Sequence, residues 1–156
     1  MASNEPTPIF KLNSTIILPS LAEANKYMYV HEIDGGWGLP QGGVNLFESP
    51  ASGATREAME ELGVVAVAER IVGFYPLVSG RGNYVFKIVY SGRIIEGNPI
   101  ANRSEGIDDV RAFSLGEVRV LDKRKELRGA NNLTALEDFF ARKTFPLDII
   151  RPISDK

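Results

Sequence analysis

The chain has 156 residues, of which 44% are hydrophobic and 24% are charged, so it is expected to form one globular domain rather than a disordered chain. Cysteine is absent and His31 is the one histidine, which excludes disulfides, thiolate metal sites and any zinc site built on two imidazoles. The formal net charge of −2 gives no strong field that would favour DNA or an acidic membrane.

Residues 1–8 are predicted to be a flexible N-terminus, followed by a single domain at 9–156. The first ten residues contain Glu5 and two prolines but no basic residue, which is the wrong pattern for a signal peptide. The longest apolar runs are far shorter than the ~20 residues that cross a bilayer. We therefore expect a cytoplasmic protein that does not enter the membrane.

Segments rich in β-branched and aromatic residues predict a series of strands. The expected strands cover residues 14–18, 26–33, 64–77, 83–90 and 110–113. Residues 37–48 contain three glycines and a proline, which predicts an irregular loop shaped for a function. Residues 78–82 between two predicted strands are expected to form a hairpin loop.

The clearest predicted helix covers residues 49–63. Ser49 is a favourable N-cap, Pro50 fits the first helical position, and Gly63 is a favourable left-handed stop. A glycine inside this helix, Gly53, indicates that another segment, such as the backbone at Gly42, approaches closely there.

The C-terminal third is less regular. Residues 114–128 are ambiguous, and the charged run at 122–126 is expected to be a solvated turn. Asn131 or Asn132 is expected to cap a further helix that continues to Lys143. Strands mixed with two separated helices predict a layered α/β domain with helices covering a mixed sheet.

Three glutamates share one face of the helix at 49–63. Glu57, Glu60 and Glu61 have the i, i+3, i+4 spacing, and their charges repel one another unless a cation neutralises them. Arg56 can offset one charge, and a hard divalent ion such as Mg²⁺ is the simplest further complement. Taken alone, this stretch is more typical of an ordinary solvated acidic helix face.

The wider sequence changes that balance. From residue 42 to 64 the chain reads GGVNLFESPASGATREAMEELGV, which resembles the Nudix box at every specified position. Those positions are Gly42, Glu48, Arg56, Glu57, Ala58, Glu60, Glu61, Gly63 and Val64. The resemblance to the MutT-like Nudix hydrolase family implies the Nudix fold, an α/β/α sandwich with a mixed β-sheet.

The resemblance also implies an activity, the hydrolysis of the pyrophosphate bond in a nucleoside diphosphate linked to another group. It places Mg²⁺, or Mn²⁺, on Glu57, Glu60 and Glu61 together with the carbonyl of Gly42. Arg56 is expected to pair with Glu48 and to tie the loop to the helix.

The sequence offers more than one candidate for the general base and for the further contacts to the substrate. The resemblance implies that the general base is a box glutamate or a carboxylate from a later loop, and Glu105 is the candidate in such a loop. Arg81 in the hairpin loop is a candidate to reach a phosphate, and Tyr84 is a candidate to stack on a base. The alternatives are an exposed loop arginine and a tyrosine that packs on the sheet.

The candidate substrates are a dinucleoside polyphosphate, a nucleoside triphosphate, and capped or 5′-triphosphorylated RNA. The rival hypothesis is a Nudix module that senses a nucleotide without cleaving it. Retention of Glu57, Glu60 and Glu61 favours the enzyme, and the sequence leaves open whether the protein forms a homodimer.

Overall fold

The computed structural model describes residues 9–129 and 131–154, so the predicted flexible segment at 1–8 lies outside the described residues. Seven strands, three α-helices and two short 3₁₀ helices follow one another within these ranges. In chain order they are β1 (Phe10–Ile17), β2 (Tyr27–Glu32), β3 (Gly36–Gly38), β4 (Gln41–Gly43), α1 (Pro50–Leu62), β5 (Val65–Val78), β6 (Tyr84–Glu96), η1 (Arg103–Glu105), β7 (Ile107–Phe113), α2 (Leu115–Lys123), α3 (Asn131–Phe140) and η2 (Leu147–Ile149).

The strands form two sheets. The larger has the order β4-β1-β6-β5 and is mixed, because β1 runs parallel to β6 while the other neighbours are antiparallel. The smaller is antiparallel, with the order β3-β2-β7. The predicted mixed sheet is therefore confirmed.

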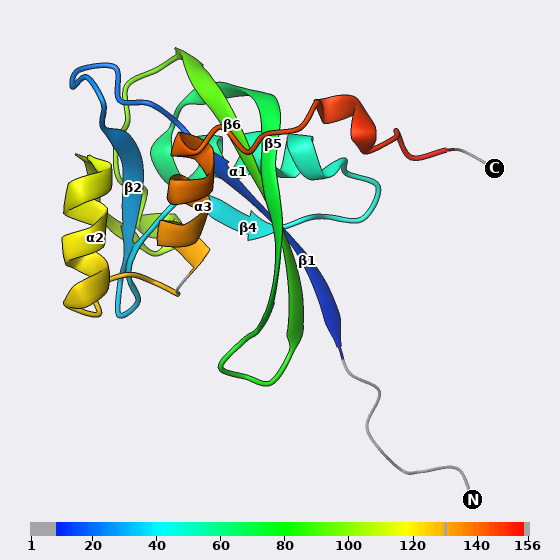
Figure 1. Ribbon diagram of the computed structural model, residues 1–156, viewed down its shortest axis with the longest axis horizontal. Coiled ribbons are helices and arrows are strands. Elements are labelled where there is room, and N and C mark those ends of the chain that lie inside the picture. The colour runs from blue at the N-terminus through cyan, green and yellow to red at the C-terminus, as the bar shows by residue number, and fades with distance from the viewer. Residues whose placement is uncertain (1–8, 130, 155–156) are drawn as a thin grey trace, which may run out of the picture.

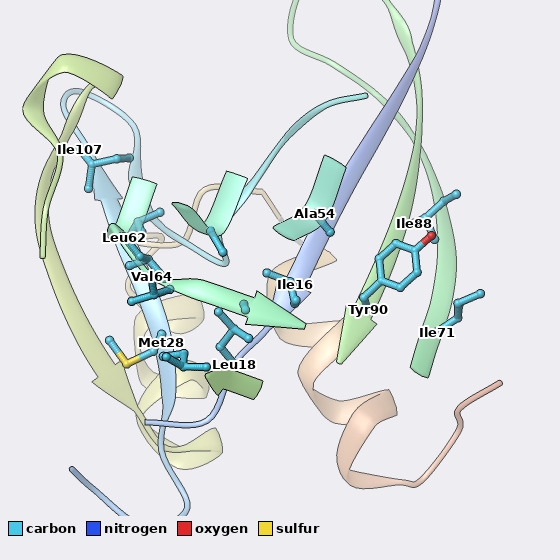
Figure 2. Packing of buried hydrophobic residues seen from close by; sticks show 14 residues of the cluster. Ile16, Leu18, Met28, Ala54, Leu62, Val64, Ile71, Ile88, Tyr90 and Ile107 are labelled. Atoms are coloured by element: carbon cyan, nitrogen blue, oxygen red, sulfur yellow. The ribbon is translucent and has the colours of Figure 1, made fainter. Parts of the chain in front are cut away.

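Successive residues of the central strands point to opposite sides, which produces two hydrophobic clusters. Ile16 packs with Ala54, Ala58 and Leu62 of α1 in the cluster that Figure 2 shows. The next residue, Ile17, packs in the second cluster, which includes residues of α2 and α3. The result is the expected α/β/α sandwich, with α1 and α3 on opposite faces of the larger sheet (Figure 1).

Helix α1 forms where its end signals predict it. The Ser49 hydroxyl accepts a hydrogen bond from the Ser52 N–H at 3.1 Å, and Pro50 occupies the first turn. Gly63 ends the helix in the left-handed region with φ 67°, and its N–H donates to the Met59 carbonyl. The predicted helix at 49–63 is thus confirmed to within its capping residues.

The segment at 37–48 is more regular than expected. It contains the whole of β4 and the last two residues of β3, and each of these strands is three residues long. These strands exist because β3 pairs with β2 and β4 pairs with β1, which are long-range contacts that local glycine content does not reveal. Gly53 is approached by the side chains of Glu48 and Val44 rather than by the glycine backbone at 42–43.

The ambiguous segment at 114–128 contains helix α2. Ser114 and Glu117 form a reciprocal capping box, the S-x-x-E signal that identifies this helix start in the sequence. The charged run at 122–126 is exposed, as predicted, but Asp122 and Lys123 belong to α2 and only the residues after them leave the helix.

Helix α3 differs from expectation at both ends. It begins at Asn131 and ends at Phe140 instead of Lys143. The prediction that Asn131 or Asn132 caps the helix is wrong, because both lie within it and the Asn132 oxygen accepts the N–H of Leu39 at 3.0 Å. None of the helices within the described ranges is long and apolar enough to cross a membrane.

The packing of α1 predicts a specific loss of stability. Leu62 is fully buried, so Leu62→Ala is expected to lower the free energy of unfolding by about 2–5 kcal/mol through lost burial and a residual cavity. Chemical denaturation measures this. Leu46 is 83% exposed, and Leu46→Ala is the control, with an expected change below about 0.5 kcal/mol; equal losses in the two variants would contradict the assignment.

Candidate active site

Arg56 connects the loop after β4 to helix α1. Its Nε donates to Glu48 Oε1 at 2.8 Å and its Nη2 donates to Glu48 Oε2 at 3.1 Å, which is a bidentate ion pair. The same Nη2 donates to the Gly43 carbonyl at 2.8 Å. The hydrogen bonds from Arg56 hold the pKa of Glu48 below its ordinary value. The loop and the helix are therefore fastened together at one guanidinium.

The remaining arm of Arg56 contacts two of the box glutamates. Its Nη1 donates to Glu57 Oε1 at 2.6 Å and to Glu60 Oε2 at 2.8 Å. Each of these bonds joins an ionised donor to a carboxylate, so it is stronger than a neutral hydrogen bond. Arg56 thus offsets part of the charge repulsion along the acidic face.

Glu57 lies against a glycine that leaves room for it. A Cβ atom on Gly42 would come within 2.0 Å of Glu57 Oε1, so the carboxylate occupies the space that any side chain at 42 would need. Glu57 is 9% exposed. Burial raises its pKa, and the hydrogen bond from Arg56 opposes that rise.

Glu61 is the most buried of the three glutamates, with 6% exposure. Its Oε2 accepts the backbone N–H of Gln41 at 3.2 Å. Burial raises the pKa of Glu61 to about 8, while the positive charge of Arg128 acts in the opposite direction. A buried carboxylate with so little compensation favours a proton or a cation at this position.

The described residues contain no group of three acidic or histidine side chains that already converges as a metal ligand set. Arg56 holds Glu57 and Glu60, and Glu61 is directed toward Gln41. The donor set nevertheless fits a hard divalent ion, because it consists of carboxylate oxygens on one helix face beside a backbone with no side chain.

Glu105 lies at the end of η1 and is exposed. The Asn102 amide donates to the Glu60 carbonyl at 2.7 Å, which fastens this segment to the end of α1. The negative charge of Glu105 contributes to the raised pKa of Glu57, so the structure brings Glu105 toward the box glutamates. The neighbouring acids Asp108 and Asp109 are occupied by His31 and Arg111.

The structure does not bring Arg81 or Tyr84 to these glutamates. Both lie at the turn between β5 and β6, which extends away from α1 in Figure 1. Arg81 is exposed, and Tyr84 is 50% exposed and pairs with Phe10 at the beginning of β1.

A cleft of about 430 Å³ beside the glutamates was not predicted from the sequence. Its polar lining includes Lys87, Arg128 and Gln41. Lys87 lies within the otherwise apolar run YVFKIVY, and this interruption is the signal that marks it. Arg128 lies far along the chain, so its proximity to Lys87 depends on the tertiary fold.

Comparison with known proteins identifies the family. The family model of the NUDIX domain matches residues 17–136, which include the whole of the Arg56 network and its glutamates. The chain belongs to the NUDIX family. The comparison with curated proteins found no match.

Solved structures of NUDIX proteins share the fold. A NUDIX hydrolase from Nitrosomonas europaea is 26% identical, with a TM-score of 0.80 over 93% of this chain and 97% of that one. An ADP-ribose pyrophosphatase from Streptococcus suis is 24% identical, with a TM-score of 0.60 over 88% and 93%. The NUDIX domain of Shewanella oneidensis NrtR, complexed with ADP ribose, is 18% identical, with a TM-score of 0.66 over 91% and 92%.

The contact between Gly42 and Glu57 predicts a difference between adjacent glycines. Gly42→Ala is expected to displace the Glu57 carboxylate, which lowers Mg²⁺ affinity about tenfold or more and the free energy of unfolding by about 1–3 kcal/mol. Gly43→Ala is the matched control, because a Cβ there meets nothing within 4 Å. Calorimetric titration with Mg²⁺ compares the two variants. Equal affinities would show that the position of the Glu57 carboxylate does not determine Mg²⁺ binding.

The raised pKa of Glu61 predicts a pH-dependent stability. The folded-state pKa of about 8 exceeds the ordinary value of 4.5, so the metal-free protein loses stability as pH rises between these values. Glu61→Gln is expected to raise the unfolding temperature by roughly 5 °C at about pH 9 and to leave it nearly unchanged at about pH 4. Thermal scans in EDTA test this, and a pH-independent difference would refute the cause given.

Proposed function

We propose that the chain is a Mg²⁺-dependent hydrolase that cleaves the pyrophosphate bond of a nucleoside diphosphate linked to another group. The observation that carries this proposal is the complete Nudix box, in which Arg56 fastens the glycine loop to a helix face bearing Glu57, Glu60 and Glu61. Membership in the NUDIX family supports a pyrophosphohydrolase activity.

Glu57, Glu60, Glu61 and the Gly42 carbonyl are the groups that would hold Mg²⁺, with Mn²⁺ as the alternative metal. When bound, the ion polarises phosphoryl oxygens and lowers the pKa of a coordinated water. The burial of Glu57 and Glu61 supports this assignment, since a cation offsets the cost of two charged carboxylates away from water.

The other roles follow from exposure and contacts. Arg56 is a positioning residue, because its donors are already directed to the loop and to two glutamates. Water attacks phosphorus and a carboxylate accepts its proton, while the bond from that phosphorus to the bridging oxygen breaks and the second phosphate leaves with this oxygen. Glu60, whose side chain is 38% exposed, and Glu105, which is also exposed, are the candidates for this base.

The substrate is proposed to be derived from a nucleotide. The ADP-ribose pyrophosphatase and the ADP-ribose complex among the similar structures support that class. Nucleoside triphosphates, dinucleoside polyphosphates and capped or 5′-triphosphorylated RNA belong to the same chemical set. The rival proposal, nucleotide sensing without hydrolysis, predicts binding without turnover across this set.

The decisive variant is Glu60→Gln. It keeps the size of the side chain and removes its charge, so kcat is expected to fall by roughly 10²–10⁴-fold with the fold intact. Product release from a panel of dinucleotides, nucleoside triphosphates, ADP-ribose and triphosphorylated RNA with Mg²⁺ measures the effect. Glu69→Gln is the control, because Glu69 is an exposed partner of Arg93 and is expected to leave kcat unchanged.

Near-normal turnover in Glu60→Gln would refute the assignment of the site. Binding of nucleotides with no hydrolysis by the wild-type protein would instead favour the sensing module.

A further inference from the structure

The cleft of about 430 Å³ lies on the sheet face opposite α1, beside the beginning of α3. Lys87 of β6 lines it and is directly paired in register with Asn13 of β1, which also lines it. Apolar side chains complete the wall, and a wall of this kind strengthens electrostatic interactions inside the cleft. The apolar side chains of this wall are those of Leu77, Val78 and Val85.

Lys87 is a buried cation without a counter-charge. It is 6% exposed, yet among residues 9–129 and 131–154 it forms neither an ion pair nor a hydrogen bond. Burial lowers its pKa to about 8, and the charge of Arg128 contributes to this. Burying most of a charged lysine without a partner is costly, and an anion in the cleft would offset that cost.

The other polar groups of the cleft are suited to donate hydrogen bonds. The Gln41 Oε1 accepts from the Thr15 hydroxyl at 3.3 Å, which leaves the amide nitrogen of Gln41 as its free end. Asn13 also lines the cleft, and its Oδ1 is buried with no partner in the described part of the chain.

The beginning of α3 adds main-chain donors. Asn131 lines the cleft, and the first turn of this helix contains no acidic residue. The first N–H groups of a helix have no partner within the helix and favour an anion. The helix start and the unpaired Lys87 therefore point independently to the same kind of ligand.

The cleft adjoins the carboxylates of α1. Gln41 lines the cleft while its backbone N–H donates to Glu61. Arg128 also lines it, and the charge of Arg128 influences the pKa values of both Lys87 and Glu61. Glu32 pairs with Arg128, so Lys87 is the cleft cation that remains uncompensated.

We propose that Lys87, Arg128 and the first turn of α3 form a subsite for a phosphoryl group of the substrate, beyond the diphosphate at the Nudix box. This inference rests on the proposed function and makes it more specific, because it favours substrates with three or more phosphates over those that end in a neutral sugar.

The direct test is calorimetric titration with inorganic tripolyphosphate in EDTA, where neither metal nor turnover contributes. The wild-type protein is expected to bind, and Lys87→Met to bind at least about tenfold more weakly, because it removes the charge and keeps the length of the side chain. Lys123→Met is the matched control, since Lys123 is exposed on α2, and its affinity is expected to stay within about twofold.

A second variant, Lys87→Gln, keeps a polar head and is also expected to weaken binding, which protects the test if Lys87→Met fails to fold. With Mg²⁺, Lys87→Met is expected to raise KM for a nucleoside triphosphate about tenfold and to change KM for ADP-ribose by a much smaller factor. Unaltered tripolyphosphate affinity in both Lys87 variants, or equal loss in Lys123→Met, would overturn the subsite. If the wild-type protein hydrolysed none of the substrates, the proposed function would be refuted, while the titration in EDTA would still test the subsite.

Discussion

A single guanidinium joins the two parts of the candidate active site. Arg56 makes five hydrogen bonds, which reach the loop at Gly43 and Glu48 and the helix face at Glu57 and Glu60. Without this cation, three carboxylates would repel one another across a short distance and the loop would lack its attachment to α1. The same guanidinium therefore sets the positions of Glu57 and Glu60, while Glu61 is held separately by the backbone N–H of Gln41.

Burial of Glu57 and Glu61 away from water lowers the stability of the folded protein. Each carboxylate occupies a place where an apolar side chain would stabilise the protein, and the raised pKa values express that cost. The alanines on the neighbouring stripe of α1 supply the compensating contacts to the core. Helix α1 therefore packs against the core with one face and carries the glutamates of the candidate site on the other.

The sequence predicts what is encoded locally. The ends of α1 depend on Ser49, Pro50 and Gly63, and the box depends on spacing within 23 consecutive residues, so both could be read directly. The strands β3 and β4 and the cleft could not, because they depend on pairing between distant segments. Lys87 and Arg128 meet only after β6 and the beginning of α3 are brought together by the two sheets. The capping box of α2 was a readable local signal.

Asn132 links two segments that lie far apart in the sequence, one at Leu39 and one at Arg128. Its oxygen receives the amide of Leu39, two residues ahead of Gln41, and its nitrogen donates to the carbonyl of Arg128. The Asn132 side chain therefore connects the segment just before β4 to the turn just before α3. The two cleft walls that carry Gln41 and Arg128 are therefore held at a fixed separation by a single side chain.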